Sequence, residues 1–166
     1  LSAIRFLFGK FFQNKMKLKL PKLPKLRHIA LTGILVGFAS GITGTGGGIV
    51  IDHKVLQGRN NIGGEWGHVT LPNRSDDEKK YVKHCYCGKN GCMETYISGP
   101  GFASTFNLRF NKDYDSHKIL EGFKEHDPDC IFALEQYTDH LARGLSLVCN
   151  ILDPDVIVLG GGMSNI

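Results

Sequence analysis

Short apolar runs separated by glycines dominate residues 29–56. The runs Ile29–Val36 and Ile49–Asp52 predict β-strands, because short apolar runs bounded by turn residues are typical of buried strands. Residues 52–54 predict a hairpin turn that leads into Val55–Leu56. This part of the chain is therefore expected to contribute strands to a sheet.

The spacing becomes helical after Cys92. The pattern predicts a turn of helix at 93–97, a break at 98–101, a new helix starting at 102–106, a short amphipathic helix at 115–124 and a long helix at 128–152. The long helix repeats apolar residues in steps of three and four, so one of its faces is expected to be core. Pro128 fits its N-terminal turn, and Asp153–Pro154 is expected to end it.

The long predicted helix is followed by the apolar run Val156–Leu159 and then by Gly160–Gly162. The run predicts a buried strand of the parallel type. A helix, an apolar strand and glycines at the carboxyl end of the strand form the α/β arrangement in which ligands bind.

Charge is distributed unevenly along the chain. Residues 1–51 carry eight Lys and Arg and no Asp or Glu, whereas the rest carries twelve basic and sixteen acidic side chains. Nucleic-acid binding could draw only on the first segment, and no such partner is expected. Residues 1–28 form a basic segment with prolines at 21 and 24, which is expected to be disordered or aberrant. A membrane-surface arm or a transit-like leader is the alternative.

The apolar content is 42% over 166 residues, enough for one domain with a proper core. Residues 29–42 form the longest candidate membrane segment, but the segment is short and interrupted by glycines. We therefore expect a cytoplasmic protein with no membrane partner.

The stretch from Gly63 to Gly99 carries the candidate chemistry. His68, Cys85, Cys87 and Cys92 have the composition of a closed tetrahedral zinc site. Disulfides are the competing interpretation, but five is an odd number of cysteines and no secretory leader is visible. Glu65 and Glu94 flank the cluster, which suggests a rigid substrate pocket.

Other polar residues near this stretch are expected to have ordinary roles. The charged residues 73–84 are interpreted as a solvated face. The remaining histidines show no constellation and are interpreted as surface residues, with His84 as an alternative ligand: His28, His53, His84, His117, His126 and His140.

The glycine run Thr43–Gly48 allows two interpretations. It can make a tight turn between strands, or it can let backbone N–H groups approach a phosphate. It lacks the Lys of a Walker loop and the spacing of the Rossmann fingerprint. Alone it does not decide between them.

Three motifs stand in a fixed order: T-G-T-G-G-G, then G-E-W-G-H with C-Y-C-G-K-N-G-C-M-E-T, then D-P-D-V-I-V-L-G-G-G-M-S-N. This order closely resembles the ROK family of sugar kinases and related repressors, and the match runs from Thr43 to Asn165. Within the family, the motifs look most like the bacterial fructokinase branch, with the N-acetylglucosamine kinase branch next.

The resemblance implies an α/β protein with the actin-like ATPase (ribonuclease-H-like) fold, of which residues 29–166 would be part of the C-terminal domain with a zinc-binding loop. It implies ATP-dependent phosphorylation of a hexose, fructose first, with N-acetylglucosamine or glucose as alternatives and a sugar 6-phosphate as product. The implied cofactors are ATP, Mg²⁺ and structural Zn²⁺, and the implied assembly of the intact family member is a homodimer.

The resemblance also assigns residues. Glu65, His68 and Glu94 would contact sugar hydroxyls, and His68 would face the sugar with the ring nitrogen that does not bind metal. His68, Cys85, Cys87 and Cys92 would bind zinc. The ATP phosphates would lie near Thr43, Gly44, Thr45, Gly46, Gly47 and Gly48, and the adenosine near Gly160, Gly161 and Gly162.

The chain departs from the family pattern in its first part. No Asp-x-Gly-Gly-Thr loop is present, and the Asp base of the family's Asn-Asp-x-Asn segment has no counterpart in residues 1–42. Ile42 stands where the family usually has Gly. No catalytic residue is therefore assigned, and we expect a fragment or damaged copy that binds zinc with little kinase activity. A sugar-responsive repressor or a non-catalytic binding module are the alternatives.

Overall fold

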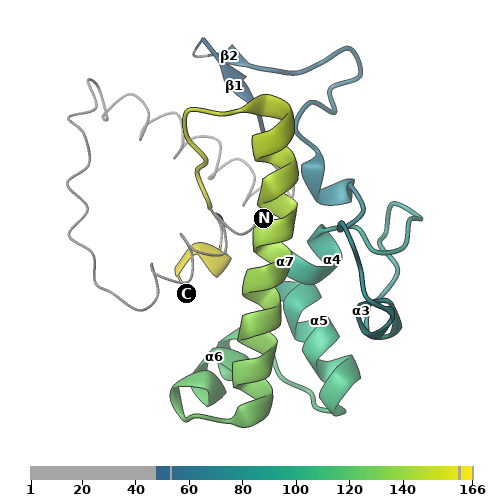
Figure 1. The fold of residues 1–166 in the computed structure, drawn as a ribbon, viewed down its shortest axis with the longest axis vertical. Helices are drawn as coiled ribbons and strands as arrows, with labels where there is room; N and C mark the ends of the chain where they lie inside the picture. Colours follow the sequence, from purple (N-terminus) through teal and green to yellow (C-terminus); the bar gives the residue numbers. More distant parts are fainter. Residues whose placement is uncertain (1–47, 53, 161, 166) are drawn as a thin grey trace, which may run out of the picture.

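The protein is described by a computed structural model that covers residues 48–52, 54–160 and 162–165 (Figure 1). Several predictions concern residues outside this range. They are the basic segment 1–28, the strand Ile29–Val36, the glycines of Thr43–Gly47, and Gly161. Within them, no helix has both the length and the apolar character to cross a membrane.

A small antiparallel hairpin begins the described part of the chain. Strand β1 (Val50–Ile51) pairs with strand β2 (Lys54–Val55), with Val50 opposite Val55. Asp52 adopts a left-handed φ of 48° in the turn, a conformation that Asp tolerates better than most residues. The predicted hairpin is confirmed, and among the described residues it is the whole of the sheet.

Helix α7 (Pro128–Leu152) is the long axis of the molecule, as Figure 1 shows. The Asp127 side chain accepts hydrogen bonds from the N–H groups of Asp129 and Cys130, and Pro128 occupies the first turn, where its missing N–H costs nothing. Asp153 ends the helix in a left-handed conformation. The prediction of a helix at 128–152 is confirmed.

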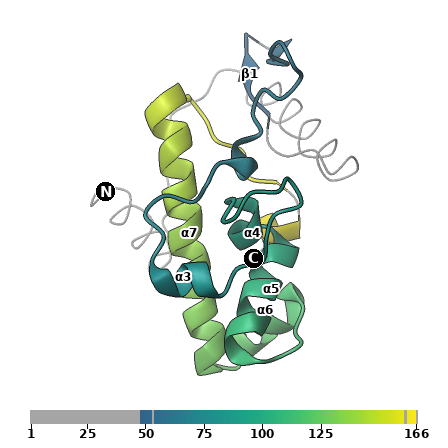
Figure 2. The ribbon, with the colours of Figure 1, turned by 90° about the vertical axis from the view of Figure 1, so that its right-hand side faces the viewer.

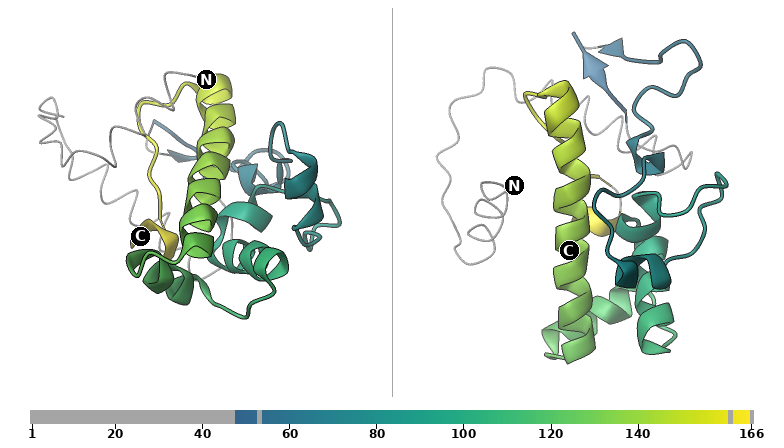
Figure 3. Two further views of the ribbon diagram at one scale, coloured as in Figure 1. Left: turned by 60° about the horizontal axis from the view of Figure 1, so that its bottom comes forward. Right: turned by 45° about the vertical axis from the view of Figure 1, so that its right-hand side comes forward.

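Three shorter helices pack around α7: α4 (Glu94–Ile97), α5 (Gly99–Phe110) and α6 (Ser116–Lys124). Figures 1 and 3 show α4 and α5 along one side of α7 and α6 near its N-terminal end. Asp115 caps α6, and the prediction of a short amphipathic helix at 115–124 is confirmed to within one residue.

The predicted break at 98–101 was too long. Only Ser98 interrupts the helices, and its hydroxyl accepts a hydrogen bond from the N–H of Gly101. A Cβ on Gly101 would lie 2.5 Å from the backbone oxygen of Glu94, so glycine permits α4 and α5 to approach closely. The sequence Gly-Pro-Gly thus starts a helix here, because Pro is tolerated in the first turn.

Two apolar clusters form the core. The larger cluster joins α5, α6 and α7 through Phe102, Phe106, Ile119, Cys130 and Ala133. The smaller cluster lies next to the cysteine-rich loop, residues 84–92, and consists of Leu71, Met93 and Tyr96, with Trp66 and Leu147 packed against them.

The charged segment 73–84 is not simply a solvated face. Residues 76–80 form helix α3 (Asp76–Lys80), which Ser75 and Glu78 start with a reciprocal capping box. In Figure 2 α3 lies in front of α7, and the Glu78 side chain of α3 reaches His140 of α7. Glu78 is only 9% exposed, so the prediction of a solvated face was wrong for this residue.

The prediction of a buried strand at Val156–Leu159 was also wrong. These four residues are 38% to 57% exposed and pair with no strand in the described part of the chain. A strand needs a neighbour for its backbone hydrogen bonds, and no described strand lies beside this run. A 3₁₀ turn, η2 (Gly162–Asn165), follows.

Candidate functional site

The loop between the 3₁₀ turn η1 (Trp66–His68) and α4 folds back on itself through two isolated β-bridges. Thr70 pairs with Cys92, and His84 pairs with Asn90. Gly88 turns the tip of the loop with a φ of +85°, a conformation that glycine adopts without a Cβ clash. The bridges bring the three cysteines of the motif to one place beside η1.

His68, Cys85, Cys87 and Cys92 place their ligand atoms within 4.8 Å of one another. The Cys87 and Cys92 sulfurs are 3.5 Å apart, and the Cys85 sulfur is 3.5 Å from His68 Nδ1. In a tetrahedral zinc site with Zn–S bonds of about 2.3 Å, neighbouring ligand atoms lie about 3.8 Å apart. The four residues therefore fit a zinc ion, and all five cysteines of the chain are free of disulfides.

The three thiols differ in their surroundings. Cys92 is fully buried, and this burial raises the pKa of its thiol to about 12. Cys87 is exposed, and a hydrogen bond from the backbone N–H of Lys89 is the main cause that lowers its pKa to about 7. A metal ion would bind all three as thiolates, so its binding releases protons.

The two ring nitrogens of His68 have different partners. Nδ1 faces the cluster and is also 3.6 Å from Oε2 of Glu94. Nε2 lies 2.9 Å from the Tyr86 hydroxyl. The nitrogen that was expected to face a sugar is thus engaged by Tyr86.

The two candidate sugar-binding carboxylates lie around this histidine. Glu94 is the first residue of α4 and lies next to Gly67, where an added Cβ would be in ordinary van der Waals contact with the Glu94 Cβ at 3.6 Å. Loss of hydration, then the charge of Glu94 and more weakly that of Glu65, raises the pKa of Tyr86. The charges of both carboxylates therefore act on the Tyr86 hydroxyl.

Helix α7 supports the loop from below through a glycine. A Cβ on Gly144 would lie 2.7 Å from the Met93 sulfur and 3.3 Å from Cζ3 of Trp66. Met93 separates Cys92 from Glu94 in the sequence, so the packing of α7 positions a predicted zinc ligand and a predicted sugar ligand together.

A second polar cluster, which the sequence analysis missed, joins α3 to α7. Glu78 Oε1 is 2.9 Å from His140 Nε2, and the guanidinium of Arg143 also pairs with this carboxylate. Arg143 donates to the backbone oxygens of Pro72 and Asn73 at 2.8 and 3.2 Å. We call Glu78, His140 and Arg143 the ionic cluster.

His140 was interpreted as a surface residue, and this was wrong, because it is only 4% exposed. Burial lowers its pKa. Burial alone would raise the pKa of Glu78, but hydrogen bonds from Arg143, Ser75 and His140 outweigh it and lower that pKa. The pair is therefore a carboxylate beside a neutral imidazole, whose Nε2–H donates.

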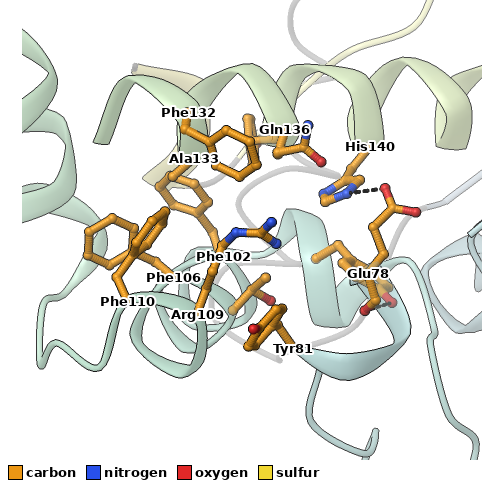
Figure 4. Close-up of a pocket in the computed structure, with 13 residues that line it drawn as sticks. Glu78, Tyr81, Phe102, Phe106, Arg109, Phe110, Phe132, Ala133, Gln136 and His140 are labelled. Carbon is orange, nitrogen blue, oxygen red and sulfur yellow. Dashed lines mark hydrogen bonds and ion pairs between the residues drawn. The ribbon is translucent and has the colours of Figure 1, made fainter. Parts of the chain in front are cut away.

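Figure 4 shows Glu78 and His140 of the ionic cluster at one end of a small cavity whose other end is lined by phenylalanine rings. The cavity volume is about 30 Å³. This is room for a water molecule and not for a substrate.

The glycines assigned to ATP are only partly described. Thr43–Gly47 and Gly161 lie outside the described residues, and Gly48 and Gly160 are exposed. Gly162 lines a cavity of about 250 Å³ between η2 and the first turns of α5 and α6. The lining residues are Gly99, Pro100, Ser116, His117, Leu120, Gly162 and Met163.

Comparisons of this sequence with a family model and with known proteins point to the same family. The model of the ROK family matches residues 36–166. An N-acetyl-D-glucosamine kinase of Erwinia tasmaniensis is 38% identical over 143 residues, which cover 84% of this chain and 46% of that protein. The N-acetyl-D-glucosamine kinase of Shigella boydii is 34% identical over 80% of this chain and 43% of its own length.

Solved structures agree with the sequence comparison. The ROK hexokinase of Thermus thermophilus matches 72% of this chain and 38% of its own, with a TM-score of 0.63 and 31% identity. A ROK family protein of Streptococcus pneumoniae in complex with sucrose matches 81% of this chain and 47% of its own, with a TM-score of 0.61 and 21% identity, and shows the fold alone. ROK kinases have an actin-like ATPase fold. The chain spans less than half the length of each of these proteins.

Proposed function

This chain belongs to the ROK family, and on that premise we propose that it supplies the sugar- and zinc-binding part of a kinase. The kinase would transfer the γ-phosphoryl group of ATP to a hexose.

The observation that carries the proposal is that His68 lies beside both a predicted zinc ligand and a candidate sugar-binding carboxylate. One ring nitrogen lies 3.5 Å from Cys85 of the four-ligand cluster and 3.6 Å from Glu94. Carboxylate oxygens accept hydrogen bonds from sugar hydroxyls, and paired acceptors distinguish hydroxyl stereochemistry. Glu65 and Glu94 would bind the sugar directly. His68 would join them through Nε2, which the Tyr86 hydroxyl holds in the sugar-free chain and which a bound sugar hydroxyl would take over.

Zinc bound by His68, Cys85, Cys87 and Cys92 would have four protein ligands and no open position. Such a zinc ion is structural and does not activate water. When bound, it would fix His68, three residues after Glu65, and the loop that leads into Glu94. The role of the protein is then to hold its own carboxylates in place before the sugar arrives.

The relatives favour N-acetylglucosamine as the sugar to test first, since both are named as kinases of that sugar. The fructose that the motifs suggested finds no support among these relatives. A cytoplasmic location, Mg²⁺ as the ATP-bound ion and assembly of the intact kinase as a homodimer remain parts of this proposal.

ATP would bind at the glycine-rich segments of the chain. The cavity beside Gly162 is lined by Gly99, Pro100 and Gly162 among others, and it is large enough for a flat heterocycle. Thr43–Gly48 would approach the phosphates. No Asp or Glu precedes Asp52, so the base that would take the proton from the sugar hydroxyl is not supplied by that segment.

We therefore expect the chain alone to bind sugar without phosphorylating it. Trp66 is the single tryptophan and lies against Met93 below the cluster, so its fluorescence reports on this site. Titration of the zinc-loaded chain with N-acetylglucosamine, glucose and fructose should change this fluorescence. The change should be largest for N-acetylglucosamine.

Glu94→Gln should weaken this response at least tenfold, because a carboxylate acceptor is lost, whereas the exposed Glu135→Gln on α7 should leave it unchanged. Equal responses from both variants would contradict the assigned site. A coupled ATP assay that gives about 1 s⁻¹ or more, an ordinary kinase rate, would contradict the expected inactivity.

A further inference from the structure

Tyr86 stands between two of the predicted zinc ligands, Cys85 and Cys87, and is 79% exposed. Its hydroxyl is nevertheless held at 2.9 Å from Nε2 of His68. The two rings meet edge to face, with centroids 5.1 Å apart and planes at 89°. A large aromatic residue at the surface is thus fixed to a metal ligand by its polar end.

The direction of this hydrogen bond follows from the other nitrogen of His68. Nδ1 faces the Cys85 sulfur at 3.5 Å, so Nδ1 is the atom that would bind the metal. A nitrogen that binds metal must present its lone pair, which places the ring hydrogen on Nε2. Nε2–H then donates, and the Tyr86 oxygen accepts.

We propose that Tyr86 is a positioning residue of the zinc centre, whose hydroxyl oxygen holds Nε2–H of His68 and thereby keeps Nδ1 turned toward the three thiolates. Metal-binding histidines almost always donate their second N–H to an acceptor, and this acceptor sets the orientation of the ring. Glu94 lies on the Nδ1 side of His68, so among the partners described for this ring only Tyr86 accepts from Nε2.

The proposal rests on the zinc part of the proposed function and is independent of the sugar and of ATP. It explains why a tyrosine hydroxyl occupies the nitrogen that the sequence analysis assigned to a sugar.

The test is Tyr86→Phe in the full chain, which keeps the ring and removes only the hydroxyl. Zinc affinity is measured by competition with a chromophoric chelator. Loss of such a partner typically costs tenfold to a hundredfold in metal affinity, and we expect about tenfold at this exposed position. Tyr81→Phe, at the C-terminal end of α3, is the matched control and should bind zinc as the unchanged chain does.

Two further measurements separate positioning from a general loss of stability. The Co²⁺-loaded Tyr86→Phe variant should show an altered visible absorption spectrum. In the zinc-loaded chain with ¹⁵N-labelled histidine, the Nε2–H signal of His68 should exchange faster with water in the variant. Neither readout responds to packing elsewhere.

The proposal is overturned if Tyr86→Phe retains the zinc affinity, the Co²⁺ spectrum and the protected Nε2–H of the unchanged chain. If zinc affinity falls as expected but no sugar alters Trp66 fluorescence, the Tyr86 proposal stands and the sugar site fails. If the unchanged chain binds no zinc, both proposals are wrong.

Discussion

The predicted zinc site and the ionic cluster bring polar side chains together in opposite ways. The zinc ligands lie within 24 positions of one another, in one loop, and need an added ion at their centre. The ionic cluster joins Glu78 to His140 and Arg143 across 62 and 65 positions, and its own charges compensate one another. The zinc site is therefore complete only when metal is bound, whereas the ionic cluster needs nothing beyond the folded chain.

The two clusters meet at α4. The Tyr96 hydroxyl donates to the backbone oxygen of Glu78 at 3.0 Å, and the Tyr96 ring lies 4.8 Å from that of His140. Glu94 begins the same helix and faces His68. The ionic cluster thus holds one side of the candidate sugar site, and the metal would hold the other.

The largest expected effect comes from the metal. Zinc at about 1,000 times its dissociation constant should raise the free energy of unfolding by about 4 kcal/mol, because it binds only the folded loop. Urea unfolding followed by circular dichroism, with and without zinc, measures this gain. Mg²⁺ should give none, because thiolate and imidazole ligands do not favour it.

Cys87→Ser is the sharpest variant for this comparison, because Cys87 is exposed and its replacement disturbs no packing. Without metal the variant should unfold like the unchanged chain, and with zinc it should lose most of the gain. Cys149→Ser, outside the cluster, should keep the gain. An equal gain in both variants would show that the four residues are not the ligand set.

The next largest effect is expected from Glu78→Ala. Removing Glu78 takes away the buried carboxylate that pairs with Arg143 and leaves only Asp139, 2.9 Å from its Nε, as a counter-ion. We expect a loss of about 3 kcal/mol in the free energy of unfolding, with no change in zinc stoichiometry. Asp76→Ala, which breaks only an exposed pair with Lys79, is the control and should have little effect. Similar unfolding of both variants would contradict the importance of the ionic cluster.

The smallest effect is a pH dependence of stability. The pKa of His140 is lowered from 6.5, so as pH falls below 6.5 the unfolded chain takes up a proton that the folded chain does not. The pKa of Glu78 is lowered from 4.5, so its contribution is present above 4.5 and is lost as pH falls further. Both terms make the free energy of unfolding decrease toward acid pH.

Urea unfolding between about pH 7.5 and about pH 5 measures the His140 part. His140→Gln keeps an N–H donor for Glu78 and removes the titrating ring. We expect a flatter profile for this variant over that interval. A profile as steep as that of the unchanged chain would assign the dependence to other groups.

The sequence predicts those parts of the molecule whose partners are close along the chain. The helix at 128–152 follows from its own apolar period, the hairpin at 50–55 from its turn, and the four candidate ligands from their spacing. Each of these features can be identified from fewer than 30 consecutive residues.

Features that depend on distant partners were missed. The spacing Ser75-x-x-Glu78 is a capping-box signal that could have predicted α3, but nothing local shows that Glu78 would meet Arg143. Conversely, Val156–Leu159 has the composition of a strand but has no described partner, so composition alone was misleading.

Gly144 limits how this protein could be engineered. Replacing a glycine in the middle of a helix by alanine is an ordinary route to a more heat-resistant enzyme, worth about 0.5 to 1 kcal/mol. In α7 the added methyl group would lie 2.7 Å from the Met93 sulfur and against Trp66. A stabilised design should therefore preserve this glycine and seek its gains at helix positions that face away from the cysteine-rich loop.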